Sequence, residues 1–226
     1  MKGLKMFTST LKIVVLSFFI VAVVLDSTAV AQKTSLKPYG IKSGIIEYKY
    51  SGVRTGTSTL YFDDYGLKSA MKNNIKMEGK SDNGWIISLK DEQYIFDPAK
   101  SNEGIKMKNP LLEGFFEMQQ SDFDKFVQEF YTKMGYKKVG TEKYAGKDCI
   151  AYKGDLGKIL IWNGILLYTE SNFAGISSKQ EITSLKVNVP VDSKYFQIPK
   201  NIKFTEAPDF DDIDKMIEQE SDDETE

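Results

Sequence analysis

The chain has 226 residues, 41% of them hydrophobic and 12% aromatic, which are values typical of a protein with one sizeable folded core. Its net charge of −2 combines −10 in Glu206–Glu226, +2 in residues 1–31 and +6 in the region between them. The chain has no His, one Cys and one Arg, which is Arg54. These counts exclude the usual Ser-His-Asp triad, Cys-His pair, zinc site and internal disulfide, and they argue against a nucleic-acid surface.

The first 31 residues are typical of a secretory leader. Three lysines precede an uncharged run from Ile13 to Leu25, and Ala29-Val30-Ala31 then forms a small-x-small cleavage motif. The uncharged run is too short to cross a bilayer, which takes ~20 residues. No Cys lies near the cleavage motif, so the acceptor for a lipid anchor is absent. We expect a periplasmic or secreted chain that begins near residue 32 and has no stable membrane anchor.

Strands dominate the first part of the mature chain. The clearest alternation of apolar and polar residues runs over 67–78, as in an antiparallel strand with one exposed face. Strands are also predicted at 45–50 and 56–62, and a hairpin is predicted at 85–90 and 93–96. The exposed face of the long strand carries Lys68, Lys72 and Lys76. This lysine row has two interpretations: contact with anionic lipid head groups, or protection of a sheet edge.

A helical region follows. Asn109-Pro110 is a helix-start signal, and a second helix is predicted to begin at Ser121, with Asp124 completing a capping box. The second helix has an apolar face with helical spacing, and Gly135 is the expected stop. That face consists of Phe123, Phe126, Val127, Phe130, Tyr131 and Met134.

Strands resume after this helix, at 136–142, 147–153, 158–162, 165–171 and 179–189. Asn163-Gly164 between two apolar runs predicts a two-residue type I′ turn. Both faces of this hairpin are apolar, whereas an antiparallel hairpin usually has one exposed face. We therefore expect a helix, a bound apolar molecule or a partner to cover the second face.

A single cysteine, a pair of aspartates and the acidic tail could each be functional or merely structural. Cys149 lies on a predicted strand and is expected to be a small buried residue rather than a reactive thiol. Asp63-Asp64 fits a solvated turn better than a calcium site, because no EF-hand spacing surrounds it. The acidic tail, 206–226, is interpreted either as a solvated block or as a segment that docks to a basic partner.

Three segments resemble exported lipid-carrying domains. They are the turn and strand at Tyr144–Tyr152, the hairpin at Lys158–Glu170 and the exit segment at Val191–Pro199. On these segments the chain resembles periplasmic lipoprotein carriers, of the outer-membrane lipoprotein-sorting type, over roughly Gly44 to Pro199. The resemblance implies a mainly β fold with helices (α+β), in which a curved antiparallel sheet of about nine strands forms a half-open barrel around a helical plug. Those carriers also use an Arg near the barrel mouth as a gate contact, and Arg54 is the one Arg available here.

The predicted organisation is therefore a signal peptide at 1–31, a half-barrel domain at 32–205 and the acidic tail at 206–226. The candidate ligand site is a set of apolar side chains that would line a cavity between sheet and helix. They are Trp85, Phe115, Phe116, Met118, Leu160, Trp162 and Leu166. The competing interpretation is that these residues fill an ordinary core, which is the usual fate of aromatic and Met side chains.

The function predicted from these observations is that of an exported, soluble, non-enzymatic protein that holds an acyl chain or another apolar molecule. No cofactor, metal or nucleic acid is expected. The alternative is an envelope protein-interaction or structural module without a cavity, which contacts a protein partner through the acidic tail. Catalysis ranks last, because the sequence has no His and no nucleophile motif.

Overall fold

The computed structural model describes residues 36–77, 79–118, 122–173 and 175–207. These residues belong to one compact unit, Ser35–Glu226. The predicted leader at 1–31 and nearly all of the predicted acidic tail lie outside the described residues. No helix in the described part of the chain is long and apolar enough to span a membrane.

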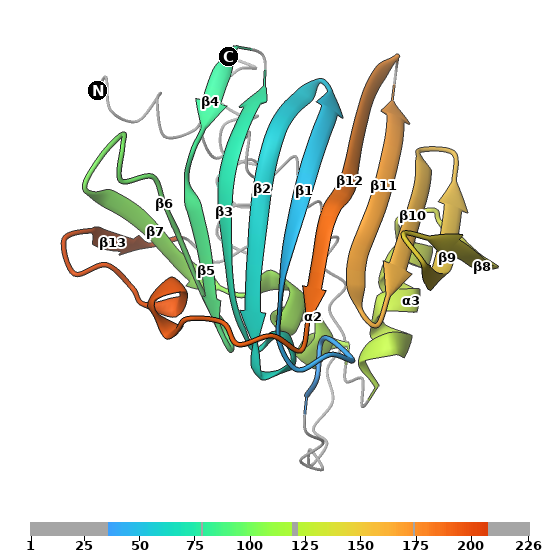
Figure 1. The fold of residues 1–226 in the computed structure, drawn as a ribbon, viewed down its shortest axis with the longest axis horizontal. Coiled ribbons are helices and arrows are strands. Elements are labelled where there is room, and N and C mark those ends of the chain that lie inside the picture. The colour runs from blue at the N-terminus through green and yellow to red at the C-terminus, as the bar shows by residue number, and fades with distance from the viewer. Residues whose placement is uncertain (1–35, 78, 119–121, 174, 208–226) are drawn as a thin grey trace, which may run out of the picture. The chain divides into compact units, whose positions relative to one another are not determined.

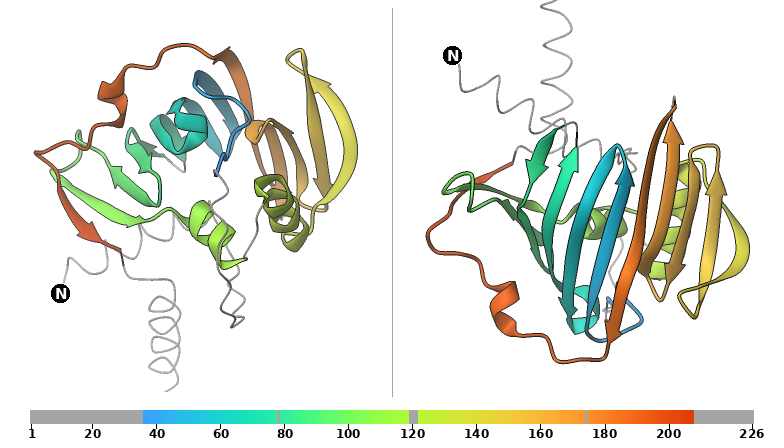
Figure 2. Two further views of the ribbon diagram at one scale, coloured as in Figure 1. Left: turned by 90° about the horizontal axis from the view of Figure 1, so that it is seen from below. Right: turned by 45° about the horizontal axis from the view of Figure 1, so that its top comes forward.

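The described residues form one large sheet with two α-helices on its concave side (Figures 1 and 2). The strand order is β13-β7-β6-β5-β3-β2-β1-β12-β11-β10-β9-β8, and β4 pairs with β3. All pairs are antiparallel except β13 with β7, which is parallel. The predicted curved, unclosed, mainly β architecture is thus correct, whereas about nine strands were expected and the described residues form thirteen.

The strands of the first half are β1 (Gly44–Gly52), β2 (Arg54–Asp63), β3 (Lys68–Met77), β4 (Lys80–Asp82), β5 (Trp85–Leu89), β6 (Glu92–Phe96) and β7 (Glu103–Lys108). Those of the second half are β8 (Lys137–Tyr144), β9 (Lys147–Gly154), β10 (Gly157–Trp162), β11 (Ile165–Phe173), β12 (Ile176–Val187) and β13 (Lys203–Glu206). The helices are α2 (Pro110–Glu117) and α3 (Phe123–Lys133), with short 3₁₀ turns η1 (Asp64–Gly66) and η2 (Ser193–Phe196).

The middle of the sheet joins distant parts of the chain. β1 pairs with β12, and its other neighbour is β2, which in turn pairs with β3. Along β1, Ile46, Tyr48 and Tyr50 are buried while Glu47 and Lys49 are exposed, as expected for a strand with one covered face. The buried face continues through Leu60 and Phe62 of β2 and forms the main core.

The opposite face of β3 and β5 is covered locally by the exit segment. Tyr195 of η2 stacks on Tyr61 with ring centroids 3.8 Å apart, and Phe196 and Ile198 join the same apolar cluster. The predicted packing of this segment back onto the sheet is confirmed. Ala70 is buried beneath it, although the alternation of β3 places Ala70 on the face that carries the lysines.

Candidate functional site

Side-chain caps position the two helices. The Asn109 side chain accepts a hydrogen bond from the backbone N–H of Leu111, so α2 begins at Pro110 as predicted. α3 begins one residue later than expected, because the Asp122 carboxylate accepts from the N–H groups of Asp124 and Lys125 and is the N-cap. The prediction of a cap at Ser121 is therefore wrong, since an Asp at the next position satisfies the same donors.

An aromatic cluster joins the two helices to each other. Phe115 of α2 contacts Phe123 and Phe126 of α3 at centroid distances of 5.5 and 5.6 Å, and all three are buried. Its members outside the helical region are Leu36 and Leu67. We call it the helix cluster; its members are Leu36, Leu67, Leu111, Leu112, Phe115, Met118, Phe123, Phe126 and Val127.

A second cluster attaches α3 to the sheet. Val127 and Tyr131 pack against Tyr152, Ile159 and other side chains of β9, β10 and β11. The Tyr131 and Tyr152 rings lie 5.1 Å apart. Burial raises the pKa of Tyr131 to about 12. A helix is thus what covers one face of the β10–β11 hairpin, as one of the three sequence-based expectations proposed.

The other face of that hairpin belongs to the main core. Leu160 alternates with Ile159 and Ile161 and packs with Cys149, Ala151 and residues of β1 and β2. Asn163 and Gly164 both have positive φ, at 49° and 74°, as the predicted type I′ turn requires.

An N-terminal segment fixes one end of the sheet. The Tyr39 N–H donates to the carbonyl of Tyr65, and the Gly40 N–H donates to the carbonyl of Asn163, both at 2.9 Å. The Tyr39 ring meets Phe62 edge-on at 5.0 Å, and burial raises its pKa to about 12. This segment therefore ties the β2–β3 turn to the β10–β11 turn.

The end of the sheet where β2 begins is polar. The Tyr50 and Ser58 hydroxyls are 3.0 Å apart, and the Arg54 guanidinium lies 5.0 Å from the Tyr50 ring centroid. Burial is the main cause that raises the pKa of Tyr50. Asn73, opposite Ser58, donates to the Asp82 carboxylate at 3.2 Å, while its amide oxygen has no hydrogen-bond partner among the described residues. Buried polar and apolar residues thus alternate along this inner face.

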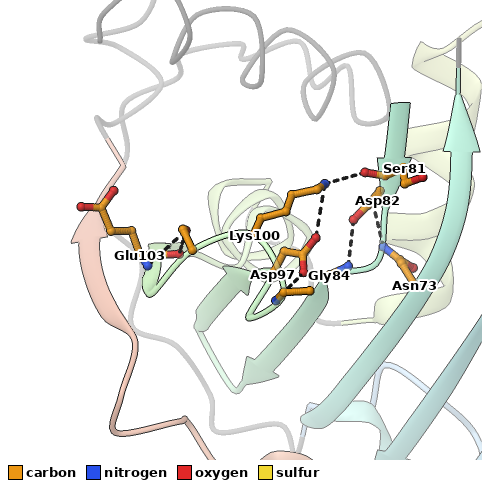
Figure 3. A network of polar contacts seen from close by, with 9 residues as sticks. Asn73, Ser81, Asp82, Gly84, Asp97, Lys100 and Glu103 are labelled. Atoms are coloured by element: carbon orange, nitrogen blue, oxygen red, sulfur yellow. Dashed lines mark hydrogen bonds and ion pairs between the residues drawn. The ribbon is translucent and has the colours of Figure 1, made fainter. Parts of the chain in front are cut away.

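A polar network holds the nearby turns (Figure 3). Asp82 also accepts from the Gly84 N–H at 3.0 Å. Lys100 pairs with Asp97 at 3.2 Å and donates to the Ser81 carbonyl. Since these contacts are between adjacent turns and strand ends, their role is to fix β4 beside the β6–β7 connection.

A pocket of about 450 Å³ lies at the same end of the sheet, and most of its bordering residues are of polar types or are glycines. It is bordered by Ser51, Gly52, Gly157, Glu170, Ser171, Asn172, Ser177, Ser178 and Lys179. No cluster of three or more potential metal ligands occurs within the described ranges. Cys149 is fully buried and burial raises its thiol pKa, which confirms the structural interpretation of this residue.

The seven predicted site residues fall into different clusters. Phe115 and Met118 lie together in the helix cluster, and Phe116 beside them is 59% exposed. Leu160 and Trp162 belong to the main core, and Leu166 lies under α3. Trp85 packs elsewhere, 6.4 Å from Tyr195 on the face covered by η2.

Three buried tyrosines were not among the seven predicted site residues, although Tyr131 belongs to the predicted apolar face of α3. Tyr39, Tyr48 and Tyr131 each have a pKa raised by burial, and the Tyr48 hydroxyl donates to the Leu166 carbonyl at 3.0 Å. The available signal was the placement of Tyr48 on the buried side of an alternating strand. Tyr39 had no such signal, because it lies in an irregular segment.

A scan against known protein families finds no match, and no curated protein matches this chain in sequence. Solved structures do match. An uncharacterized conserved protein from Thermus thermophilus is 8% identical with a TM-score of 0.49, over 74% of this chain and 92% of the other. The MucA/MucB complex of Pseudomonas aeruginosa contains a chain that is 11% identical with a TM-score of 0.43, over 76% of this chain and 60% of the other.

A putative outer membrane lipoprotein-sorting protein domain from Vibrio parahaemolyticus is also similar, with 9% identity and a TM-score of 0.32, over 69% of this chain and 89% of the other. This domain carries the name of the group that the sequence resembles. Because each of these TM-scores is below 0.5, the function proposed for this chain rests on its own residues.

Proposed function

We propose that this chain is an exported, soluble, non-enzymatic binding protein that holds an acyl chain or another apolar molecule between the sheet and the α2–α3 layer. The observation that carries this proposal is the separation of the helix cluster from the main core. Side chains of the helix cluster pack mostly on one another, so the helices form a layer with its own apolar contacts. Such a layer can shift relative to the main core, with the contacts of Val127 and Tyr131 to β9 and β10 as its attachment to the sheet.

In this proposal the helices act as the plug of the half-barrel. Phe116 exposes 59% of its surface beside buried Phe115, so it is available to contact an apolar chain that enters next to α2. Removal of apolar surface from water would supply the binding free energy, at ~25 cal/mol per Å². The polar end of the ligand would lie toward Arg54 and Asn73.

Mass spectrometry of the purified chain, together with uptake of a fluorescent fatty acid, tests this proposal. Phe116→Asp is expected to weaken uptake at least tenfold, because a carboxylate would meet the apolar chain. Val139→Asp is the matched control, since Val139 is 54% exposed on β8 and is not part of the helix layer. Absence of both co-purified lipid and uptake in the unaltered protein would contradict the proposal.

A second candidate function is a protein-interaction module, and exposed apolar side chains at two hairpin turns favour it. Phe173 and Ile176 flank the β11–β12 turn with 69% and 56% exposure, and Leu156 at the β9–β10 turn is 37% exposed. The Asn172 N–H donates to the Leu156 carbonyl at 2.9 Å, so the two turns are adjacent. Phe173→Ser with Ile176→Ser would abolish partner binding but leave fatty-acid uptake unchanged.

A further inference from the structure

One face of the central sheet carries a group of exposed lysines. Alternation along β1, β3 and β12 places Lys49, Lys68, Lys72, Lys76 and Lys186 on the face opposite the main core, and all five are exposed. We call this surface the lysine face. It extends the lysine row recognised on β3 in the sequence to two further strands.

The strand register shows how open this surface is. Lys72 lies opposite Thr59, Lys76 opposite Thr55, and Lys49 opposite Thr57. Trp85 lies on the other side of Lys72, and the exit segment covers Ala70 between Lys68 and Lys72, so the open part of the lysine face extends from Lys72 toward Lys76 and Lys49.

Few carboxylates balance the lysine face. Its acidic neighbours are Glu47 on β1 and Asp63, which lies opposite Lys68 and caps η1. Glu181, opposite Lys49, pairs with Lys179 at 2.7 Å. No lysine of the face forms an ion pair with any described residue, although the Lys72 ammonium lies 5.6 Å from the Trp85 ring centroid. The surface therefore retains an excess of positive charge.

The complementary charge is present in the same chain. Residues 208–226 contain ten acidic residues and one basic residue, Lys215. The last described residue before this segment is Ala207, which directly follows β13. β13 and β3 are four strand steps apart in the sheet order, which is ~19 Å at ~4.8 Å per step. β1 lies six steps away, which is ~29 Å. A random coil of 19 residues would have a root-mean-square span of ~24 Å, and a chain of this length can extend beyond both distances.

We propose that the acidic segment 208–226 docks on the lysine face of its own chain and shields this face from other anionic surfaces. Tethering is what favours this occupant over a free partner, because a short linker gives an effective concentration in the mM range. Many weak contacts between opposite charges supply the attraction, and salt screens them. A membrane of anionic lipid would compete for the same lysines.

Zero-length carbodiimide cross-linking of the 32–226 chain, read by mass spectrometry, tests where the segment lies. At ~20 mM salt, where the Debye length exceeds 10 Å, carboxylates of 208–226 are expected to link to Lys49, Lys72 and Lys76. The yield should fall at least tenfold at ~1 M salt. Links spread evenly over exposed lysines, including Lys137 and Lys138 of β8, would overturn the proposal. Links between isotopically labelled and unlabelled chains in a mixture would also overturn it, by assigning the occupant to a second copy.

Binding to vesicles that contain phosphatidylglycerol tests the shielding. A variant with the ten acidic residues of 208–226 changed to Asn or Gln should bind these vesicles at least tenfold more tightly. Adding Lys49→Gln, Lys72→Gln and Lys76→Gln should abolish that gain, whereas Lys137→Gln, Lys138→Gln and Lys143→Gln on β8 should preserve it. Equal vesicle binding with and without the acidic residues would show that the segment does not cover the face and would refute the proposal. Fatty-acid uptake is measured separately, so this result is independent of the function proposed above.

Discussion

Truncation of Phe126 should destabilise the helix layer more than the sheet, because its ring contacts lie within the helix cluster. Phe126 is 2% exposed and contacts Phe115, Phe123 and Phe130 at centroid distances of 5.6, 5.5 and 6.1 Å. Phe→Ala in such a site costs ~3–5 kcal/mol. With a urea m-value of ~2 kcal/mol per M, the midpoint for loss of helix should fall by roughly 2 M.

Two spectroscopic probes separate the layers in this chain. Trp85 and Trp162 both lie in sheet clusters, so tryptophan fluorescence reports the sheet, while far-ultraviolet circular dichroism at 222 nm reports the helices. Phe126→Ala should lower the dichroism midpoint and leave the fluorescence midpoint nearly unchanged. The matched variant Phe62→Ala, in the main core, should lower both. Equal shifts of both midpoints in Phe126→Ala would mean that helices and sheet unfold as one unit, and would refute the argument for a movable layer.

Three further predictions concern single residues. Gly164→Ala should destabilise the fold by more than about 1 kcal/mol in urea titration, because a Cβ there would lie 2.1 Å from the Pro38 carbonyl oxygen. Gly146→Ala is the control: Gly146 has a similar φ of 73°, but a Cβ there would meet open space, so the loss of stability should be smaller. Burial raises the pKa values of Tyr39 and Tyr131 to about 12. Because both tyrosines ionise more readily in the unfolded chain, the folded state should lose stability as pH rises from about 10 to about 12. The double variant Tyr39→Phe with Tyr131→Phe should reduce that loss. Cys149 should resist a thiol reagent until the protein unfolds, because it is fully buried, and rapid modification of the native protein would contradict its placement.

The sequence predicted the local structure of this fold better than its long-range pairing. Alternation identified β3, and turn residues identified the β10–β11 hairpin, because both signals depend on neighbouring residues. β1 and β2 were also predicted as strands. Three strands, β4, β7 and β13, were not predicted. β4 and β13 have three and four residues, which are too few to show a period. The parallel partner of β13 had no local signal, since β7 lies about a hundred residues earlier in the chain.

In the candidate site, too, local features were predicted and long-range placement was not. Helical spacing predicted the buried face of α3, including Phe123, Phe126 and Tyr131. It could not show that Trp85 lies under η2 rather than near the helices, because that depends on how the exit segment crosses the sheet. Aromatic composition identifies residues that seek burial, but only the topology decides which of them share a surface.

The pairing of β1 with β12 sets the order in which this protein can fold. Ile46 lies opposite Leu185, so the centre of the sheet joins residues near the two ends of the folded region. In a chain that leaves a translocation channel with its N-terminus first, β1 and β2 emerge early. β1 then lacks its partner β12 until that strand has also emerged. Contacts so distant in sequence also slow folding. The topology thus delays completion of the sheet until β12 is available, which is compatible with the proposed export of the chain in an unfolded state.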